Sequence, residues 1–249
     1  MPVSAAMVEA LALVTGQRIL ELAAGPGDTG FMAAELIKPG GVLVCSDGAE
    51  AMLEVARGRA AEAGIDNVEF AQLELEWIDL PTASVDAVLC RWGIMLIVDP
   101  EAAAQEVRRV LRPGGRAAFA VWDLPERNPW ATIPNRVMVE LRHLPPPDPE
   151  APGMFTLAAE GSLQELLEAA GFVDVAVGAV SIERRYDAIE QYIQDTVDMS
   201  SVFGARWGEL EPADRDEVQA QVRAGAERFV TPGGTVVLPG RSLVAAASA

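Results

Sequence analysis

The sequence predicts an α/β fold: a doubly wound, mostly parallel sheet of seven strands, with helices on both faces and a helical lid inserted before the last strand. Short apolar runs alternate with helical patterns from Arg18 to Asp123, and a glycine-rich turn follows the first run. After Trp122 prolines become frequent, which indicates an insertion. We therefore expect a single domain over residues 1–249, with a core at 17–123 and substrate-side insertions at 124–160 and 187–232.

The apolar runs of the core are aliphatic and are bounded by Gly, Pro or Asp, as buried parallel strands are. They are Arg18–Leu22, Gly41–Cys45, Val68–Gln72, Ala87–Cys90 and Arg116–Trp122. Two more strands are predicted at Phe172–Arg184 and at Thr235–Ala247, the latter entered through two glycines. Strands that alternate with helices imply right-handed crossovers and a sheet covered on both faces.

Helices are predicted from apolar spacing and from end signals. Met52, Val55 and Ala56 share one face of a helix that stops at Gly64, and Asp99 caps a helix that begins with Pro100. Four more helices are predicted over Pro134–Leu144, from a capping box at Ser162 and Glu165, over Asp187–Ser200, and from a capping box at Asp214 and Glu217. The last two form the lid, and an extended loop fills the rest of Asn128–Pro152.

Composition excludes several classes of partner. The net charge of −18 repels DNA, RNA and anionic membrane surfaces, while half of the residues are hydrophobic and the mean hydropathy is +0.19. No apolar run approaches the roughly 20 residues that span a bilayer, and Met1–Ala10 lacks the pattern of a signal peptide. Cys45 and Cys90 form no CxxC pair and are interpreted as reduced core thiols. We expect a cytoplasmic protein.

The glycine-rich turn is Glu21-Leu-Ala-Ala-Gly25-Pro-Gly27-Asp-Thr-Gly30, and it opens the first core helix. Its glycines match the dinucleotide-binding spacing of Rossmann-like folds, which is a weak signal alone. Glu21 ends the strand, where a carboxylate attracts a cationic amine and repels the pyrophosphate of NAD. Asp47, after the second strand, can accept two hydrogen bonds from ribose hydroxyls. S-adenosylmethionine offers both a ribose and an amino-acid group.

Four segments together resemble the class I methyltransferases of the methyltransferase type 11 and ubiquinone/menaquinone-biosynthesis type. The resemblance covers about Gln17–Asp123. The glycine turn matches the first motif, with Ala23 where glycine is common, and Ser46–Leu53 matches the second. Val68–Glu76 matches the adenine-binding turn, with Glu74 where aspartate is usual, and Val110–Gly115 matches the turn before the fifth strand.

The resemblance implies a role for each matching residue. Glu21 and the backbone near Ala23, Gly25 and Gly27 would hold the methionine portion of the cofactor, and Asp47 the ribose. The residues implied around the adenine are Met52, Leu73, Glu74 and Leu75, and those implied near the methionine end and the acceptor are Arg91 and Trp92. Relatives carry a longer N-terminal helical cover, which is short or absent here because about 17 residues precede the first strand.

The sequence allows two interpretations, a functional one and a structural one, for several side chains. Trp92, Ile94 and Met95 either line an acceptor pocket or belong to the core. His143, the only histidine, is either a general base or, as we favour, a surface or structural residue. Tyr192 lies on an apolar helix face and is interpreted as packing.

The sequence thus predicts an enzyme that transfers a methyl group in line from S-adenosylmethionine to a small molecule, by O- or C-methylation. Positioning is expected to carry catalysis, so no catalytic residue is assigned. No metal is expected, because Cys90-Arg91-Trp92-Gly93 offers no carboxylate ligand. We expect a monomer or homodimer. The alternatives are an NAD-dependent oxidoreductase and an S-adenosylmethionine-binding protein without catalysis.

Overall fold

The computed structural model describes residues 2–148 and 151–249, so residues 149–150 of the predicted loop lie outside the described part. The chain divides into two compact units. The core unit comprises Met1–Asp123, Pro152–Val180 and Ser242–Ala249, and the inserted unit comprises Leu124–Ala151 and Ser181–Arg241. The last two strands of the chain run through both units.

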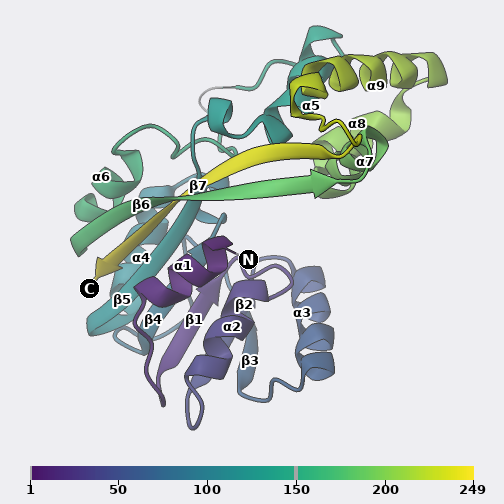
Figure 1. The fold of residues 1–249 in the computed structure, drawn as a ribbon. Helices are drawn as coiled ribbons and strands as arrows, with labels where there is room; N and C mark the ends of the chain where they lie inside the picture. The colour runs from purple at the N-terminus through teal and green to yellow at the C-terminus, as the bar shows by residue number, and fades with distance from the viewer. Residues whose placement is uncertain (1, 149–150) are drawn as a thin grey trace. The chain divides into compact units, whose positions relative to one another are not determined.

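Helices and strands alternate through most of the core unit, except that β4 follows β3 with no helix between them (Figure 1). The strands are β1 (Arg18–Leu22), β2 (Val42–Asp47), β3 (Val68–Gln72), β4 (Val85–Arg91), β5 (Leu111–Trp122), β6 (Val173–Tyr186) and β7 (Val236–Ser248). The α-helices are α1 (Pro2–Ala10), α2 (Asp28–Leu36), α3 (Glu50–Ala63), α4 (Pro100–Val110), α5 (Pro129–Glu140), α6 (Ser162–Ala169), α7 (Ile189–Met199), α8 (Ser201–Glu209) and α9 (Pro212–Ala226). Short 3₁₀ helices lie at Ile94–Leu96, Pro125–Arg127 and Glu227–Phe229.

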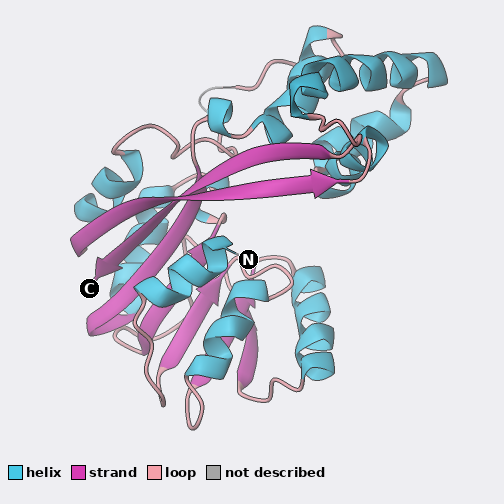
Figure 2. Ribbon diagram, in the orientation of Figure 1, coloured by secondary structure: helices cyan, strands magenta, loops and turns pink. Residues whose placement is uncertain are grey.

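All seven strands form one sheet in the order β3-β2-β1-β4-β5-β7-β6, which confirms the predicted fold class (Figure 2). Strands β1 to β5 are parallel, and β7 is antiparallel to β5. β1 has β2 on one side and β4 on the other, so the strand order reverses direction at β1. Ligands of open α/β sheets bind beyond the carboxyl ends of the strands at such a reversal.

The core lies where the central strands meet their helices. Strands β1, β2 and β4 and the second half of β5 are almost wholly buried, because apolar side chains face helices on both sides. Both cysteines belong to this core. α1 and α2 pack together, and a hydrogen bond of 2.9 Å joins the hydroxyls of Ser4 and Thr29 in their buried contact.

Two of the predicted helix ends in the core unit are confirmed, and one predicted helix start is wrong. Gly64 ends α3 with a left-handed φ of +68°, and the Asp99 side chain caps α4 by accepting from the Ala102 N–H at 2.9 Å. The capping box at Ser162 and Glu165 is wrong, because Gly161 is the N-cap of α6 and Ser162 is already helical. Met52 and Val55 are about half-exposed, at 43% and 49%, whereas Ala56 is buried.

The apparent break before β5 is part of the strand. β5 begins at Leu111, five residues earlier than predicted, and its pairing with β4 shifts register between Val85 and Ala87. The Arg-Pro-Gly-Gly segment therefore forms an irregular stretch of β5, where a proline is tolerated because the regular pairing is interrupted.

In the inserted unit, α5 starts at Pro129, five residues before the predicted start, and contains Pro134. Proline has no N–H to bond the carbonyl four residues earlier, which is that of Trp130. The Tyr192 hydroxyl donates to this carbonyl at 2.8 Å. Tyr192 is fully buried and packs as predicted, and its hydroxyl explains why a proline can sit inside the helix.

Three α-helices lie between β6 and β7 where two were predicted. α7 and α9 bury the expected apolar faces, and α8 was missed. The Ser200 side chain caps α8 by accepting from the Phe203 N–H at 3.2 Å. The capping box at Asp214 and Glu217 is also wrong, because α9 begins at Pro212. Within the described residues, no helix is long and apolar enough to cross a membrane.

Candidate cofactor site

The predicted cofactor residues gather at the carboxyl edge of the central strands. Glu21 is the last residue but one of β1, while Asp47 is the last residue of β2 and Arg91 the last of β4. The parallel register places Glu21 opposite Cys45 on β2 and opposite Leu89 on β4. These side chains therefore surround the reversal point of the sheet, the position at which this architecture binds ligands.

The glycine-rich turn folds back against Asp47. The turn runs through left-handed backbone at Ala23 (φ +49°), Gly25 (φ +53°) and Gly27 (φ +85°). Asp47 Oδ2 accepts from the Gly25 N–H at 2.8 Å, and Oδ1 accepts from the Ala49 N–H at 2.9 Å. Because each carboxylate oxygen accepts about two hydrogen bonds, both retain capacity for hydroxyl donors.

Gly93 accommodates the departure from glycine at position 23. An L-residue in the left-handed region costs about 1–2 kcal/mol relative to ordinary backbone. The methyl group of Ala23 occupies a space that Gly93 leaves open, because a Cβ on Gly93 would lie 2.5 Å from that of Ala23. The small residue at 93 therefore makes alanine possible at 23.

Gly25 and Gly27 serve different purposes. A Cβ on Gly27 would lie 2.5 Å from the Phe31 ring, so this glycine is required by the packing of the protein itself. A Cβ on Gly25 would meet none of the described residues within 4 Å. Gly25 is thus the position at which the turn presents open backbone.

Glu21 is a buried carboxyl with only one of its oxygens bonded. It is 3% exposed, and Oε1 accepts from the Gly30 N–H in the first turn of α2 at 2.8 Å. Oε2 is buried and has no hydrogen-bond partner among the residues that the structure describes. Burial raises the pKa of Glu21 to about 8, although the Gly30 N–H and the charge of Arg91 favour its ionised form.

The residues implied around the adenine follow β3 and begin α3. Leu73 and Leu75 are each 7% exposed, and Met52 is 43% exposed. Glu74 is exposed, and a Cβ on Gly48 would lie 3.1 Å from its carboxylate. The glycine after Asp47 thus allows the Glu74 carboxylate to lie close to the backbone that follows β2.

Trp92 is held by three neighbours at the end of β4. Its ring stacks on Trp122 at 4.2 Å, the Arg91 guanidinium lies 4.6 Å from the ring centroid, and its indole N–H donates to Ser242 Oγ at 3.0 Å. Its backbone is left-handed, with φ +60°. Trp92 is therefore fixed in orientation before any ligand arrives.

The other candidate residues of the sequence lie in the buried core or in the inserted unit. Ile94 and Met95 are 1% and 2% exposed, which favours the core interpretation. His143 belongs to the inserted unit, where its carbonyl accepts from Arg206 Nε at 2.9 Å. Among the described residues, no group of three or more His, Cys, Asp or Glu side chains could hold a metal ion. The metal-independent mechanism stays a prediction.

Sequence reasoning missed two charged residues beside the glycine turn. Asp28, the first residue of α2, forms ion pairs with Arg59 of α3 and with Arg91. Asp28 lies inside the glycine-rich motif, so it could have been named as a site residue from the sequence. Arg59 could not, because its contact with Asp28 spans 31 residues of sequence.

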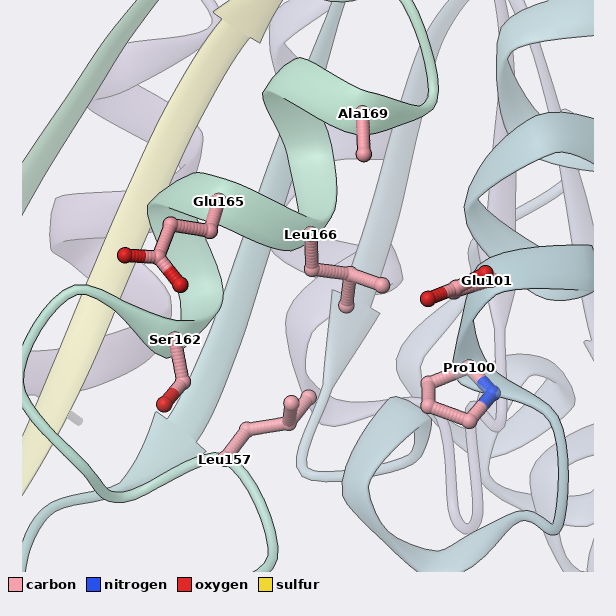
Figure 3. A pocket seen from close by; sticks show the side chains of 7 residues that line it. All are labelled: Pro100, Glu101, Leu157, Ser162, Glu165, Leu166 and Ala169. Atoms are coloured by element: carbon pink, nitrogen blue, oxygen red, sulfur yellow. The ribbon is translucent and has the colours of Figure 1, made fainter.

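The core unit also has a hollow of about 350 Å³ between the start of α4 and α6 (Figure 3). It is lined by Pro100, Glu101, Leu157, Ser162, Glu165, Leu166 and Ala169. None of the predicted cofactor residues lines this hollow.

The residues at the carboxyl edge fit the cofactor that the resemblance implies. Glu21 Oε2 is a buried acceptor that no described residue bonds, the kind of atom that an ammonium group would complete. Asp47 retains lone pairs for ribose hydroxyls, and Gly25 presents open backbone. The role of each residue stays a prediction.

Comparison with known proteins agrees with this geometry. A family model described as a methyltransferase domain matches residues 13–150, more than half of the chain. A demethylmenaquinone methyltransferase of Clavibacter sepedonicus is 40% identical over 120 residues, which are 48% of this chain and 47% of that protein. The chain thus spans about half the length of the curated relatives it matches.

Two solved structures share the fold over nearly the whole chain. The YcgJ protein of Bacillus subtilis has a TM-score of 0.67 and 19% identity over 98% of this chain and 97% of that one. A phosphoethanolamine N-methyltransferase 2 of Haemonchus contortus, in complex with S-adenosylhomocysteine, has a TM-score of 0.59 and 17% identity over 98% of this chain and 52% of that one. With the match to the methyltransferase domain, these likenesses confirm the predicted fold and family: the chain belongs to the methyltransferase-domain family.

Proposed function

We propose that this protein is an S-adenosylmethionine-dependent methyltransferase that methylates a small molecule on oxygen or carbon. The observation that carries the proposal is the arrangement of Glu21, Gly25 and Asp47 at the reversal point of the sheet. It offers a buried carboxyl, open backbone and a bonded carboxylate, which suit an ammonium group and a ribose. Family membership supports the same activity.

The residues of this chain would bind and orient the reactants. When bound, the cofactor supplies an activated methyl group whose leaving group is its own sulfur. Asp47 would hold the ribose and Glu21 the amino group, while the fixed ring of Trp92 would limit the approach of the acceptor. Positioning of this kind supplies much of the rate enhancement when two reactants are held in line.

The start of α2 argues against the NAD-dependent alternative. A dinucleotide pyrophosphate binds to free N–H groups at a helix N-terminus. Here the Gly30 N–H is already bonded to Glu21 and is not available to a pyrophosphate. The occupied N–H disfavours a dianionic ligand at this helix start.

Calorimetry with S-adenosylhomocysteine and NAD tests the cofactor. We expect binding of S-adenosylhomocysteine in the micromolar range and no saturable binding of NAD; the reverse result would support the oxidoreductase. Turnover of labelled S-adenosylmethionine on a panel of phenols, carboxylates and quinone-like carbons then tests catalysis. Cofactor binding without turnover of any acceptor would favour the non-catalytic alternative.

The inserted unit is the proposed acceptor-selecting lid. It interrupts the chain after the last parallel strand, and inserted helices commonly close over a site. Substitutions within residues 187–232 should change acceptor preference and leave cofactor affinity within a factor of about two. Equal losses of affinity for the cofactor and for the acceptor would contradict this role.

A further inference from the structure

Asp28 is shared by two arginines that come from different elements of the core unit. Arg59 of α3 approaches Asp28 Oδ1 with Nη2 at 2.7 Å, and its Nη1 donates to the Pro26 carbonyl at 2.8 Å. Arg91 approaches Asp28 Oδ2 with Nη2 at 3.4 Å. One carboxylate therefore faces two guanidinium groups beside the glycine turn.

The two contacts are unequal. Arg59 makes two short hydrogen bonds, although its side chain is 44% exposed. Arg91 makes one long contact, although its side chain is only 13% exposed. Arg59 thus carries most of the pairing of Asp28, and the more buried Arg91 keeps only one long ion pair with the same carboxylate.

Glu21 does not supply a closer counter-ion to Arg91 at neutral pH. Burial raises the pKa of Glu21 to about 8, so its carboxyl is largely protonated below that pH. A charge that is only weakly compensated in a buried setting favours binding of an opposite charge. Arg91 ends β4 at the reversal point of the sheet, so that opposite charge would come from a ligand at the predicted cofactor site.

We propose that Arg59 is a positioning residue: by carrying most of the pairing of Asp28 it keeps Arg91 loosely paired and able to bind the carboxylate of the cofactor's amino-acid portion. The inference rests on the proposed function, since it assumes a ligand with that portion. Without Arg59, Asp28 would pair more closely with Arg91 and compete with the ligand carboxylate.

Two ligands and four variants test the proposal by calorimetry. S-adenosylhomocysteine carries the amino-acid portion, and 5′-methylthioadenosine lacks it. Arg59→Ala should lower the affinity for S-adenosylhomocysteine about tenfold, as expected for loss of a charge-assisted contact. It should change the affinity for 5′-methylthioadenosine less than about twofold. Arg57→Ala is the matched control, because Arg57 lies on the same helix, is similarly exposed and pairs with Glu50 instead of Asp28.

Removal of the competing carboxylate provides the decisive comparison. Asp28→Asn added to Arg59→Ala should restore S-adenosylhomocysteine affinity to within about threefold of wild type, and Asp28→Asn alone should bind almost normally. A purely structural role for Arg59 would show no such rescue, because the double variant also lacks the bond to Pro26. Melting temperatures confirm that each variant is folded.

The outcomes separate the two proposals. If wild-type protein fails to bind S-adenosylhomocysteine, the proposed function is wrong and this inference falls with it. Three results would overturn only the role of Arg59, provided that wild type binds S-adenosylhomocysteine. They are equal affinities of Arg59→Ala and Arg57→Ala, an equal loss of affinity for both ligands, and a loss that Asp28→Asn does not restore.

Discussion

The Glu21 carboxyl accepts a hydrogen bond from the backbone N–H of Gly30, at 2.8 Å, and so joins the end of β1 to the first turn of α2. This bond occupies one of the helix N–H groups that have no partner within the helix. A Cβ on Gly30 would overlap the second oxygen of the same carboxyl. The two residues are therefore matched in size as well as in hydrogen bonding.

The first prediction concerns Gly30. Gly30→Ala should lower the free energy of unfolding by about 1–3 kcal/mol, because the added methyl group must displace a buried carboxyl or the helix. Urea unfolding measures the change. Gly58→Ala is the control: Gly58 lies inside α3, where a Cβ would meet none of the described residues within 4 Å, and alanine there should stabilise by about 0.5–1 kcal/mol. Equal effects at both positions would contradict the close contact.

The second prediction concerns pH. The pKa of Glu21 is raised from 4.5 to about 8 in the folded protein, so between these values the folded state holds a proton that the unfolded state has lost. The contribution of Glu21 to the free energy of unfolding is therefore complete below about pH 4.5 and is lost as the pH rises toward 8. One proton gives a slope of about 1.4 kcal/mol per pH unit.

Glu21→Gln should abolish this slope between about pH 6 and 7.5, where urea unfolding can be compared with wild type. Glu62→Gln, at an exposed position on α3, should retain it. The same carboxyl must ionise to attract an ammonium group, so cofactor affinity should increase toward pH 8 in wild type and not in Glu21→Gln. Identical slopes in all three proteins would show that Glu21 is ionised at neutral pH.

The third prediction concerns Asp47. Asp47→Ala should weaken S-adenosylmethionine binding by about 2–3 kcal/mol, since it removes charged acceptors for ribose hydroxyls. The substitution also removes the bond to the Gly25 N–H, so Asp47→Asn should retain more of the fold and still bind weakly. Asp66→Ala, an exposed ion-pair partner of Lys38, controls for a general loss of acidic charge. Unchanged affinity in a folded Asp47→Ala protein would remove Asp47 from the site.

The fourth prediction concerns catalysis without a base or metal. A general base contributes about 10² to 10⁴ in rate. His143→Ala should therefore lower kcat by less than about tenfold, and EDTA should leave activity intact. Once an acceptor is known, a loss of about a thousandfold at unchanged stability would identify His143 as the base. Activity abolished by EDTA and restored by magnesium would identify a metal enzyme.

Strand order and site location were predictable because they depend on periodicity and on the ends of strands. β1 to β4 were found within a few residues, and Glu21 and Asp47 lie where each strand ends. Helix starts were less predictable, since a cap depends on backbone angles as well as residue type. Gly161 adopts the left-handed conformation with φ +84° and takes the cap position expected for Ser162.

Features that depend on distant contacts could not be read from the chain. Pro134 indicated a helix start, whereas inside α5 the carbonyl that it leaves unbonded, that of Trp130, accepts from the Tyr192 hydroxyl, 62 residues away. Arg59 gave no signal for the same reason. Such contacts are set by tertiary packing, which local propensity does not encode.

The stacked rings of Trp92 and Trp122 lie 4.2 Å apart with only 14° between their planes. Two indoles this close share their electronic excitation, so the protein should carry a built-in optical reporter: a paired positive and negative band in the far-ultraviolet circular dichroism spectrum. One member of the pair follows directly on Arg91 at the end of β4. Ligands that shift this strand end would alter the band pair, and acceptor candidates could be screened by spectroscopy without a label or a coupled assay.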